Sequence, residues 1–307
     1  MNRLLDIIVP HAQEGWEICH RFFDMLRLQL CADLSRVRVI VVHDGGGLWP
    51  SADLRIPGLD VEQVRIRKAG VSAARNYGLG VSDAEWVMFC DCDDTFSSVW
   101  SLHCILDALR SQGAARNDLL WFPFYVEENF GRNMCGLNWV FVHGKIYRRE
   151  FLIREGIRFW EALSYAEDSA FNACVDMAID PARIGEIRAD APLYVWVFNR
   201  QSVTSRPENR LKNALGLIDR HMLVTEEMKR RGLDKDAAEM AARASCDGDR
   251  LLDDRNIPET AKDPLRAKIE AFRRRWAEEI ASVPPERMAV IREASRREHG
   301  GKTKKEA

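Results

Sequence analysis

The chain has 307 residues, of which 46% are hydrophobic and 30% are charged, and its formal net charge is −2. This composition is that of a soluble globular protein, and it argues against a chain built mainly to coat nucleic acid. The first apolar run is short and contains Asp6, and no stretch reaches the roughly 18 uncharged apolar residues of a membrane span. We therefore expect neither a signal peptide nor a membrane span.

The eight cysteines form no C-x-x-C pair and no regular framework. Several lie inside apolar runs, where a reduced thiol behaves as a small hydrophobic group. This usage predicts a protein of the reducing cytoplasm without structural zinc.

Strand and helix patterns alternate in the first half of the chain, which is typical of an α/β domain with a mostly parallel sheet. The predicted strands cover residues 5–9, 37–42, 61–66, 86–90 and 119–126. Apolar residues at three- and four-residue spacing predict helices over 18–30, 73–81 and 102–109, and Ser72 is the expected N-cap of the second.

Further along, we expect a loop over 129–138, a strand over 139–142, helices over 148–155 and 161–178, and a strand over 191–198. From Pro207 onward the pattern is that of amphipathic helices, and basic residues outnumber acidic ones there, whereas the reverse holds before it. This change predicts an α/β domain over 1–207, a helical region over 208–299 and a disordered tail over 300–307.

An acidic cluster, Asp91-Cys92-Asp93-Asp94, follows directly on the predicted strand 86–90. Carboxylates at the carboxyl end of a buried strand lie at the edge where open α/β sheets bind ligands. Like charges held so close favour a bound cation, and hard oxygen ligands suit Mg²⁺ or Mn²⁺, which grip nucleotide phosphates. The simpler alternative is that Asp94 or Thr95 caps the next helix, but capping needs one such side chain.

Six motifs follow one another between residues 7 and 171. They read IIVP (7–10), VVHDGG (41–46), KAGVSAARNYG (68–78), FCDCDD (89–94), GKIYRREF (144–151) and YAEDSAF (165–171). In this order they resemble the motifs of inverting family 2 glycosyltransferases, a likeness that covers roughly residues 4–206. The resemblance implies a GT-A fold, Rossmann-like with a mostly parallel central sheet, followed here by an α-helical C-terminal extension.

The resemblance also implies an activity: metal-dependent transfer of a sugar from a nucleoside-diphosphate sugar, with a UDP-sugar favoured, to a glycan or glycoconjugate acceptor. Mn²⁺ or Mg²⁺ is the expected cofactor, with Asp93 as the leading ligand and Asp91 beside it. Asp168 is the expected general base, because inversion needs a carboxylate that removes the acceptor proton, and Glu167 raises the negative charge beside it.

The remaining site residues follow from the same resemblance. The nucleotide-sugar is expected to contact Pro10, Ala12, Asp44, Arg75, Asp91, Arg200 and Ser202. Trp139, His143 and Lys145 are expected on the acceptor side. Without the resemblance, Arg75 would be assigned to a solvated helix face and Asp168 to an acidic first turn favoured by the helix dipole.

Three positions depart from the family pattern. His43 stands in place of an Asp, Ala12-Gln13 replaces an aromatic-Asn pair, and Lys68 replaces an Asn. All three are expected around the nucleotide base, so they bear on the identity of the donor.

Two other functions stay open. The departures are compatible with a non-catalytic domain that binds a nucleotide-sugar or a protein partner. A sugar-nucleotide pyrophosphorylase is disfavoured because residues 10–14 lack the Gly-rich, Arg-containing loop that it needs.

The C-terminal helices have three possible roles: docking on the catalytic domain, forming a homo-oligomer, or touching the inner face of a membrane through the basic run 273–275. A solvated helix face is the simplest reading of that run.

Overall fold

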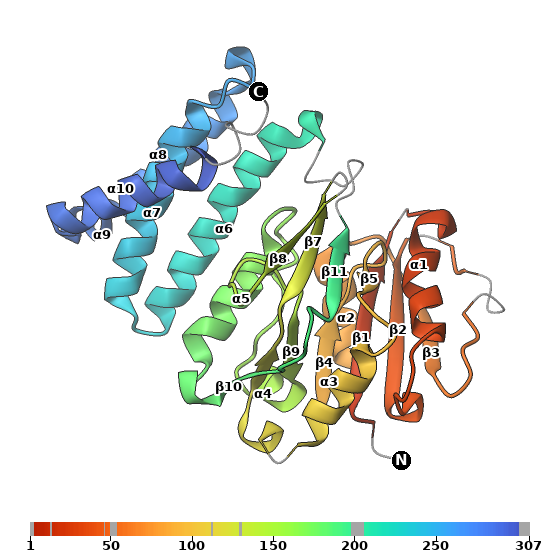
Figure 1. Ribbon diagram of the computed structural model, residues 1–307. Coiled ribbons are helices and arrows are strands. Elements are labelled where there is room, and N and C mark those ends of the chain that lie inside the picture. The colour runs from red at the N-terminus through yellow and green to blue at the C-terminus, as the bar shows by residue number, and fades with distance from the viewer. Residues whose placement is uncertain are drawn as a thin grey trace. The chain divides into compact units, whose positions relative to one another are not determined.

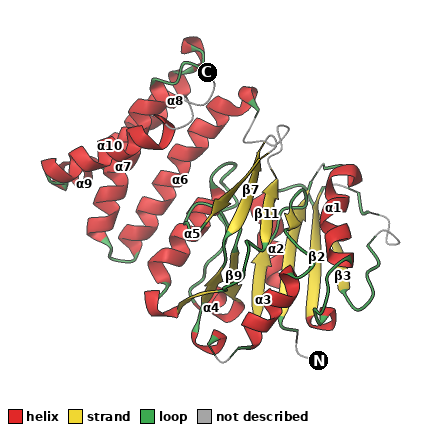
Figure 2. Ribbon diagram, viewed as in Figure 1, coloured by secondary structure: helices red, strands yellow, loops and turns green. Residues whose placement is uncertain are grey.

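The computed structural model describes residues 3–12, 14–45, 47–49, 54–111, 113–128, 131–197 and 206–300. By contacts the chain divides into two units, residues 1–162 with 171–199, and residues 163–170 with 200–307 (Figures 1 and 2). The predicted domain boundary at residue 207 stays a prediction.

A mixed sheet is the centre of the first unit. Its strands are β1 (Leu5–His11), β2 (Val37–Asp44), β3 (Asp60–Ile66), β4 (Trp86–Phe89), β6 (Leu119–Trp121), β9 (Lys145–Arg148) and β10 (Ile184–Glu186). Within the described residues their order is β10-β6-β9-β4-β1-β2-β3. Neighbours run parallel except at β9, which is antiparallel to both β4 and β6. The predicted α/β class, with a mostly parallel sheet and a helical C-terminal region, is confirmed.

Alternate residues of the central strands pack on opposite faces of the sheet, as the two-residue period of a strand requires. Leu5, Ile7 and Val9 share one hydrophobic cluster with residues of α1 (Trp16–Arg27) and α3 (Ser101–Arg110). Ile8 belongs to a second cluster on the other face. That cluster includes residues of α2 (Val71–Val81), α4 (Arg149–Arg154) and the part of α5 (Glu167–Ala178) beyond residue 170. Both faces are therefore covered, and ligands have access at the strand ends.

Gly78 sets the distance between α2 and the sheet. A Cβ at this position would lie 2.4 Å from Cγ2 of Ile8, closer than van der Waals contact permits. Only glycine lets the backbone of α2 approach β1 so closely.

A second, smaller sheet lies beside the first in the same unit (Figure 1). It consists of β5 (Thr95–Phe96), β7 (Phe124–Glu128), β8 (Gly131–Cys135) and β11 (Tyr194–Val197). The order is β5-β11-β7-β8 among the described residues. Because β5 follows the acidic cluster at once, this sheet meets the main sheet at the carboxyl end of β4.

Some predicted elements differ from those observed. The strand expected over 119–126 is two strands in different sheets, because Pro123 has no N–H to donate and the chain changes sheet there. The expected loop 129–138 contains β8, and the strand expected over 139–142 is absent from the described structure there, since β9 begins only at Lys145. The N-cap of α2 is Gly70 rather than Ser72.

The second unit is helical. Its helices are α6 (Arg210–Arg230), α7 (Asp234–Leu252), α8 (Asp263–Arg275), α9 (Ala277–Ser282) and α10 (Pro285–Gly300). Short 3₁₀ turns elsewhere cover Leu34–Arg36, Ala114–Arg116, Pro181–Arg183, Pro207–Asn209 and Glu259–Ala261. Among the described residues, no helix has the length and apolar character needed to span a bilayer.

A buried carboxylate links three of these helices. Asp247 of α7 accepts a hydrogen bond of 2.5 Å from Ser295 of α10 and lies 3.2 Å from Nε2 of His221 on α6. Burial alone would raise the pKa of Asp247, but its partners outweigh burial and hold the value at about 2. The carboxylate is therefore ionised under ordinary conditions and stabilises the packing of the helical unit.

Candidate active site

The carboxyl ends of β4, β1 and β2 lie side by side because these strands are parallel neighbours. Pro10 is the next-to-last residue of β1 and pairs with Val42, and Asp44 is the last residue of β2. The acidic cluster 91–94 follows β4 directly. The fold thus brings three of the predicted site segments to one edge of the sheet.

The four residues of the acidic cluster alternate in burial. Asp91 and Asp93 are partly exposed, whereas Cys92 and Asp94 are buried. Two carboxylates therefore face the open side of the strand end, and one points into the protein. Burial thus separates Asp91 and Asp93, which a ligand can reach, from Asp94, which it cannot.

Arg75 of α2 is the main partner of Asp91. Its Nη2 donates a hydrogen bond of 2.8 Å to Oδ1 of Asp91, while the guanidinium is buried and lies over the ring of Phe159. Burial alone would raise the pKa of Asp91, but the charges of Arg75 and His143 outweigh it and lower the pKa. Asp91, 30% exposed at its side chain, is therefore held ionised at the rim of the site.

The pKa of Asp94 is shifted in the opposite direction. Its two oxygens accept hydrogen bonds of 2.8 Å from the hydroxyl of Tyr194 and the backbone N–H of Val197, both on β11. Burial, followed by the charges of Asp91 and Asp93, raises its pKa well above the usual value. Asp94 therefore joins the small sheet to the end of β4.

His143 lies between Asp91 and Asp94, the first and last residues of the cluster. Its Nε2 is 3.7 Å from Oδ2 of Asp91 and its Nδ1 is 3.6 Å from Oδ2 of Asp94. One ligand atom from each of these three residues lies within 4.8 Å of the others, so the trio has the donors and spacing for a metal ion. The next residue, Gly144, has a φ of +68°, and a Cβ there would meet the carbonyl oxygen of Phe122 at 2.5 Å. Glycine thus permits the turn that delivers His143.

Asp44 is bound by backbone at the end of β2. Its carboxylate accepts hydrogen bonds from the N–H groups of Ala69, at 2.6 Å, and Gly70, at 2.9 Å. It therefore fixes the turn that leads into α2 and so supports Arg75. The predicted contact between Asp44 and a nucleotide stays a prediction.

Two histidines face each other at the ends of β1 and β2. Their Nδ1 atoms, in His11 and His43, lie 2.8 Å apart, within hydrogen-bond distance. Nε2 of His11 is 2.8 Å from the carbonyl oxygen of Glu14, and Nε2 of His43 is 2.9 Å from Oε1 of Gln63. The Gln63 amide is fixed in this orientation by hydrogen bonds to both backbone groups of Trp49.

These contacts assign the protons of the pair. Each Nε2 faces an oxygen that only accepts, so each must carry a hydrogen. A hydrogen bond between the two Nδ1 atoms then needs a hydrogen on one of them. Burial, the charge of His11 and that of Arg65 lower the pKa of His43, against the opposing effect of Gln63. The Trp49 ring is centred 4.3 Å from that of His11.

The other predicted residues have varied surroundings. Ala12 donates its backbone N–H to Glu14 at 2.8 Å, and buried Lys145 donates to the carbonyl oxygen of Phe141 at 2.5 Å. Trp139 packs partly buried against the second hydrophobic cluster. Arg200 and Ser202 lie outside the described residues.

Glu167 and Asp168 open α5, as predicted. By contacts they belong to residues 163–170, which group with the helical unit rather than with the sheet. The convergence of Asp168 with the acidic cluster therefore stays a prediction.

Sequence reasoning missed the histidine pair and the anchor on Asp94. His11 and His43 are 32 positions apart, and only the register of β1 against β2 makes them neighbours. The available signal was one histidine at the carboxyl end of each of two adjacent predicted strands.

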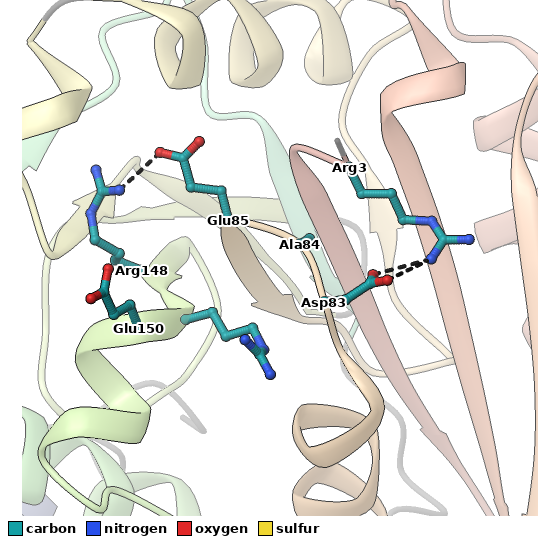
Figure 3. Close-up of a pocket in the computed structure, with 7 residues that line it drawn as sticks. Arg3, Asp83, Ala84, Glu85, Arg148 and Glu150 are labelled. Carbon is teal, nitrogen blue, oxygen red and sulfur yellow. Dashed lines mark hydrogen bonds and ion pairs between the residues drawn. The ribbon is translucent and has the colours of Figure 1, made fainter. Parts of the chain in front are cut away.

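A charged pocket of about 360 Å³ lies at the opposite edge of the sheet, where β1 and β4 begin (Figure 3). It is lined by Arg3, Asp83, Ala84, Glu85, Arg148, Arg149 and Glu150. Arg3 pairs with Asp83 and Arg148 with Glu85, so these charges offset one another. The pocket is separate from the acidic cluster.

Comparison with known proteins agrees with this geometry. Residues 6–130 match the family described as glycosyl transferase family 2. The chain is 26% identical over 238 residues, which is 67% of its length, to the uncharacterized glycosyltransferase EpsJ of Bacillus subtilis (strain 168). It spans 64% of the length of that relative.

Solved structures show the same fold. Residues 1–349 of S. aureus TarS superpose with a TM-score of 0.57 at 17% identity, covering 96% of this chain and 92% of that one. The same TarS fragment in complex with UDP-GlcNAc has a TM-score of 0.55. The mannosyltransferase PcManGT from Pyrobaculum calidifontis, in complex with GDP-Man and Mn²⁺, has a TM-score of 0.52 at 15% identity, covering 96% and 80%.

The fold is thus the GT-A fold of the solved glycosyltransferases. More narrowly, residues 6–130 match glycosyl transferase family 2, and the resemblance drawn from the six motifs is confirmed.

Proposed function

We propose that the protein transfers a sugar, with inversion, from a nucleoside-diphosphate sugar to an acceptor hydroxyl. The observation that carries the proposal is the alternation within the acidic cluster: Asp91 and Asp93 are partly open beside the buried Arg75, whereas Asp94 is tied to β11. An open carboxylate pair next to a fixed cation suits a metal-bound diphosphate.

Asp93 and Asp91 are the proposed ligands of Mn²⁺ or Mg²⁺, because carboxylate oxygens suit both ions and both side chains are accessible. A bound ion supplies positive charge that stabilises the departing diphosphate, so no catalytic acid is needed. Arg75 keeps Asp91 ionised and places a guanidinium where phosphate oxygens approach. His143 is a further candidate ligand on the buried side.

Asp168 is the proposed general base. In an inverting reaction, one carboxylate takes the proton of the acceptor hydroxyl while its oxygen attacks the anomeric carbon from the opposite side to the leaving group. Glu167 adds negative charge beside it, and Trp139 and Lys145 are kept as proposed acceptor-side residues.

The donor is proposed to lie over the ends of β1 and β2, near Pro10, Ala12 and Asp44, with Arg200 and Ser202 as donors to phosphate. TarS binds UDP-GlcNAc and PcManGT binds GDP-Man, so UDP- and GDP-sugars are the first donors to test. A glycan or glycoconjugate is the proposed acceptor.

Replacement of Asp168 by Asn tests the base. We expect Asp168→Asn to lower kcat by about 10²- to 10⁴-fold, the usual range for a lost general base, while the donor still raises Tm. Asp176→Asn, the same change at an exposed position of α5, is the matched control and should retain activity. Normal transfer by Asp168→Asn would contradict the assignment.

The metal requirement is tested separately. Release of nucleoside diphosphate in the presence of donor and acceptor should stop on addition of EDTA and return with Mn²⁺ or Mg²⁺. Tight donor binding without any release, whatever ion is added, would instead indicate a non-catalytic binding domain.

A further inference from the structure

The segment that carries the proposed base is held by the helical unit. Residues 163–170 group by contacts with residues 200–307, whereas α5 from Phe171 onward groups with the sheet. The acidic first turn of α5, with Glu167 and Asp168, therefore has its packing partners among the C-terminal helices.

One face of α6 makes this contact. A Cβ at Gly216 would lie 2.8 Å from Cβ of Tyr165, so the backbone of α6 passes directly against this segment. Four residues further along α6, Nε of Arg220 donates a hydrogen bond of 3.2 Å to Oγ of Ser169. Residues four apart share one face of a helix, so a single stripe of α6 contacts Tyr165 and Ser169, on either side of the acidic pair.

The held segment contains strained backbone. Ala166 has a φ of +59°, a left-handed conformation that residues with a Cβ rarely adopt and that persists only where the surroundings enforce it. Its carbonyl oxygen accepts hydrogen bonds of 3.1 Å from the hydroxyl of Ser169 and from the backbone N–H of Ala170. The Ser169 hydroxyl thus connects Arg220 with the residue that precedes Glu167.

Arg220 is itself fixed in place. Its Nη1 lies 3.2 Å from Nδ1 of His221 and 3.4 Å from Sδ of Met240 on α7. Nε2 of His221 lies 3.2 Å from the buried carboxylate of Asp247. The partly buried guanidinium is therefore held by side chains of both α6 and α7.

We infer that Arg220 is a positioning residue: through Ser169 it fixes the first turn of α5 and so the direction of the Asp168 carboxylate. This inference rests on the proposed role of Asp168 as general base. It assigns to the C-terminal helices a part in catalysis, because a base displaced by about 1 Å loses up to about 100-fold in rate.

Kinetics of Arg220→Met and Ser169→Ala test the inference. Each should lower kcat by about 10- to 100-fold, leave the KM of the donor within about twofold, and shift the acidic limb of the pH profile of kcat. The double variant should be no slower than the slower single variant, and Arg220→Lys, which keeps a donor, should recover part of the rate. Lys268→Met is the control, because it removes the ion pair of α8 with Asp219 of α6 without touching residues 163–170.

The background of Asp168→Asn separates this inference from the proposed function. In Asp168→Asn, the further change Arg220→Met should slow the reaction by less than about twofold, because the carboxylate that Arg220 positions is already absent. Wild-type kcat in Arg220→Met, or an equal loss in both backgrounds, overturns the positioning role. Full activity of Asp168→Asn alone overturns the base itself. Circular dichroism and Tm of each variant identify any loss that is due to unfolding.

Discussion

The carboxyl ends of β4, β1 and β2 lie at the same edge of the sheet. The polar side chains that follow β4 have different kinds of partner from those at the ends of β1 and β2. After β4, Asp91 is ionised beside Arg75, and Asp94, three residues on, is held by two neutral donors with a raised pKa. After β1 and β2, the Nδ1 atoms of His11 and His43 lie 2.8 Å apart, and burial lowers the pKa of His43. Burial and the neighbouring charges, rather than the residue type, set the direction in which each pKa is shifted.

The two strand ends also differ in their exposure to solvent. Asp91 and Asp93 are partly exposed, whereas His43 is fully buried and His11 nearly so. The acidic end is thus available to a ligand, and the histidine end supports the structure around it.

Asp93→Asn should give the largest effect. Removal of one negative ligand should lower the rate of nucleoside diphosphate release by about 100-fold or more, and Mn²⁺ should no longer raise Tm. Asp180→Asn is the control, since that carboxylate accepts from the N–H of Ala182 in a turn outside the acidic cluster. An unchanged shift of Tm with Mn²⁺ in Asp93→Asn would show that the open pair is not the metal site.

The acidic site was partly predictable because its signals are local. An apolar run followed by carboxylates located residues 91–94, and six ordered motifs gave the fold. The different pKa shifts of the two carboxylates depend on Arg75, which is distant in the chain, and on the burial of Asp94, so the sequence did not divide Asp91 from Asp94. The polar strand β8 read as a loop because its residues are largely exposed and lack an apolar face.

His43→Gln should have an intermediate effect, on the pH dependence of stability. The pKa of His43 is lowered in the folded protein, so below the unfolded value of about 6.5 the unfolded chain binds more protons. Wild-type stability is therefore lost as the pH falls through the window between the unfolded and the folded pKa. Chemical denaturation between pH 7.5 and 5 should show a smaller loss of stability in His43→Gln than in the wild type.

Loss of a less buried imidazole provides the control for that measurement. His20→Gln on α1 changes a side chain that is 42% exposed. If the free energy of unfolding changed equally with pH in the wild type and in His43→Gln, the assigned effect of His43 would be wrong.

Asp94→Asn should have the smallest effect. Because the pKa of Asp94 is raised, a neutral amide is a close substitute: its oxygen can accept from Val197 and its NH₂ can donate to Tyr194. We expect the free energy of unfolding to change by less than about 1 kcal/mol, against about 1–3 kcal/mol for Asp94→Ala, which leaves both partners unsatisfied. Equal losses in the two variants would indicate that Asp94 is needed as a charged group.

The glycine at position 78 has a consequence for how this protein tolerates change. Arg75 lies one helical turn before it, and α2 approaches β1 there with the backbone of Gly78 against the side chain of Ile8. Any side chain at position 78 would push α2 away from β1. The guanidinium beside Asp91 would move with the helix.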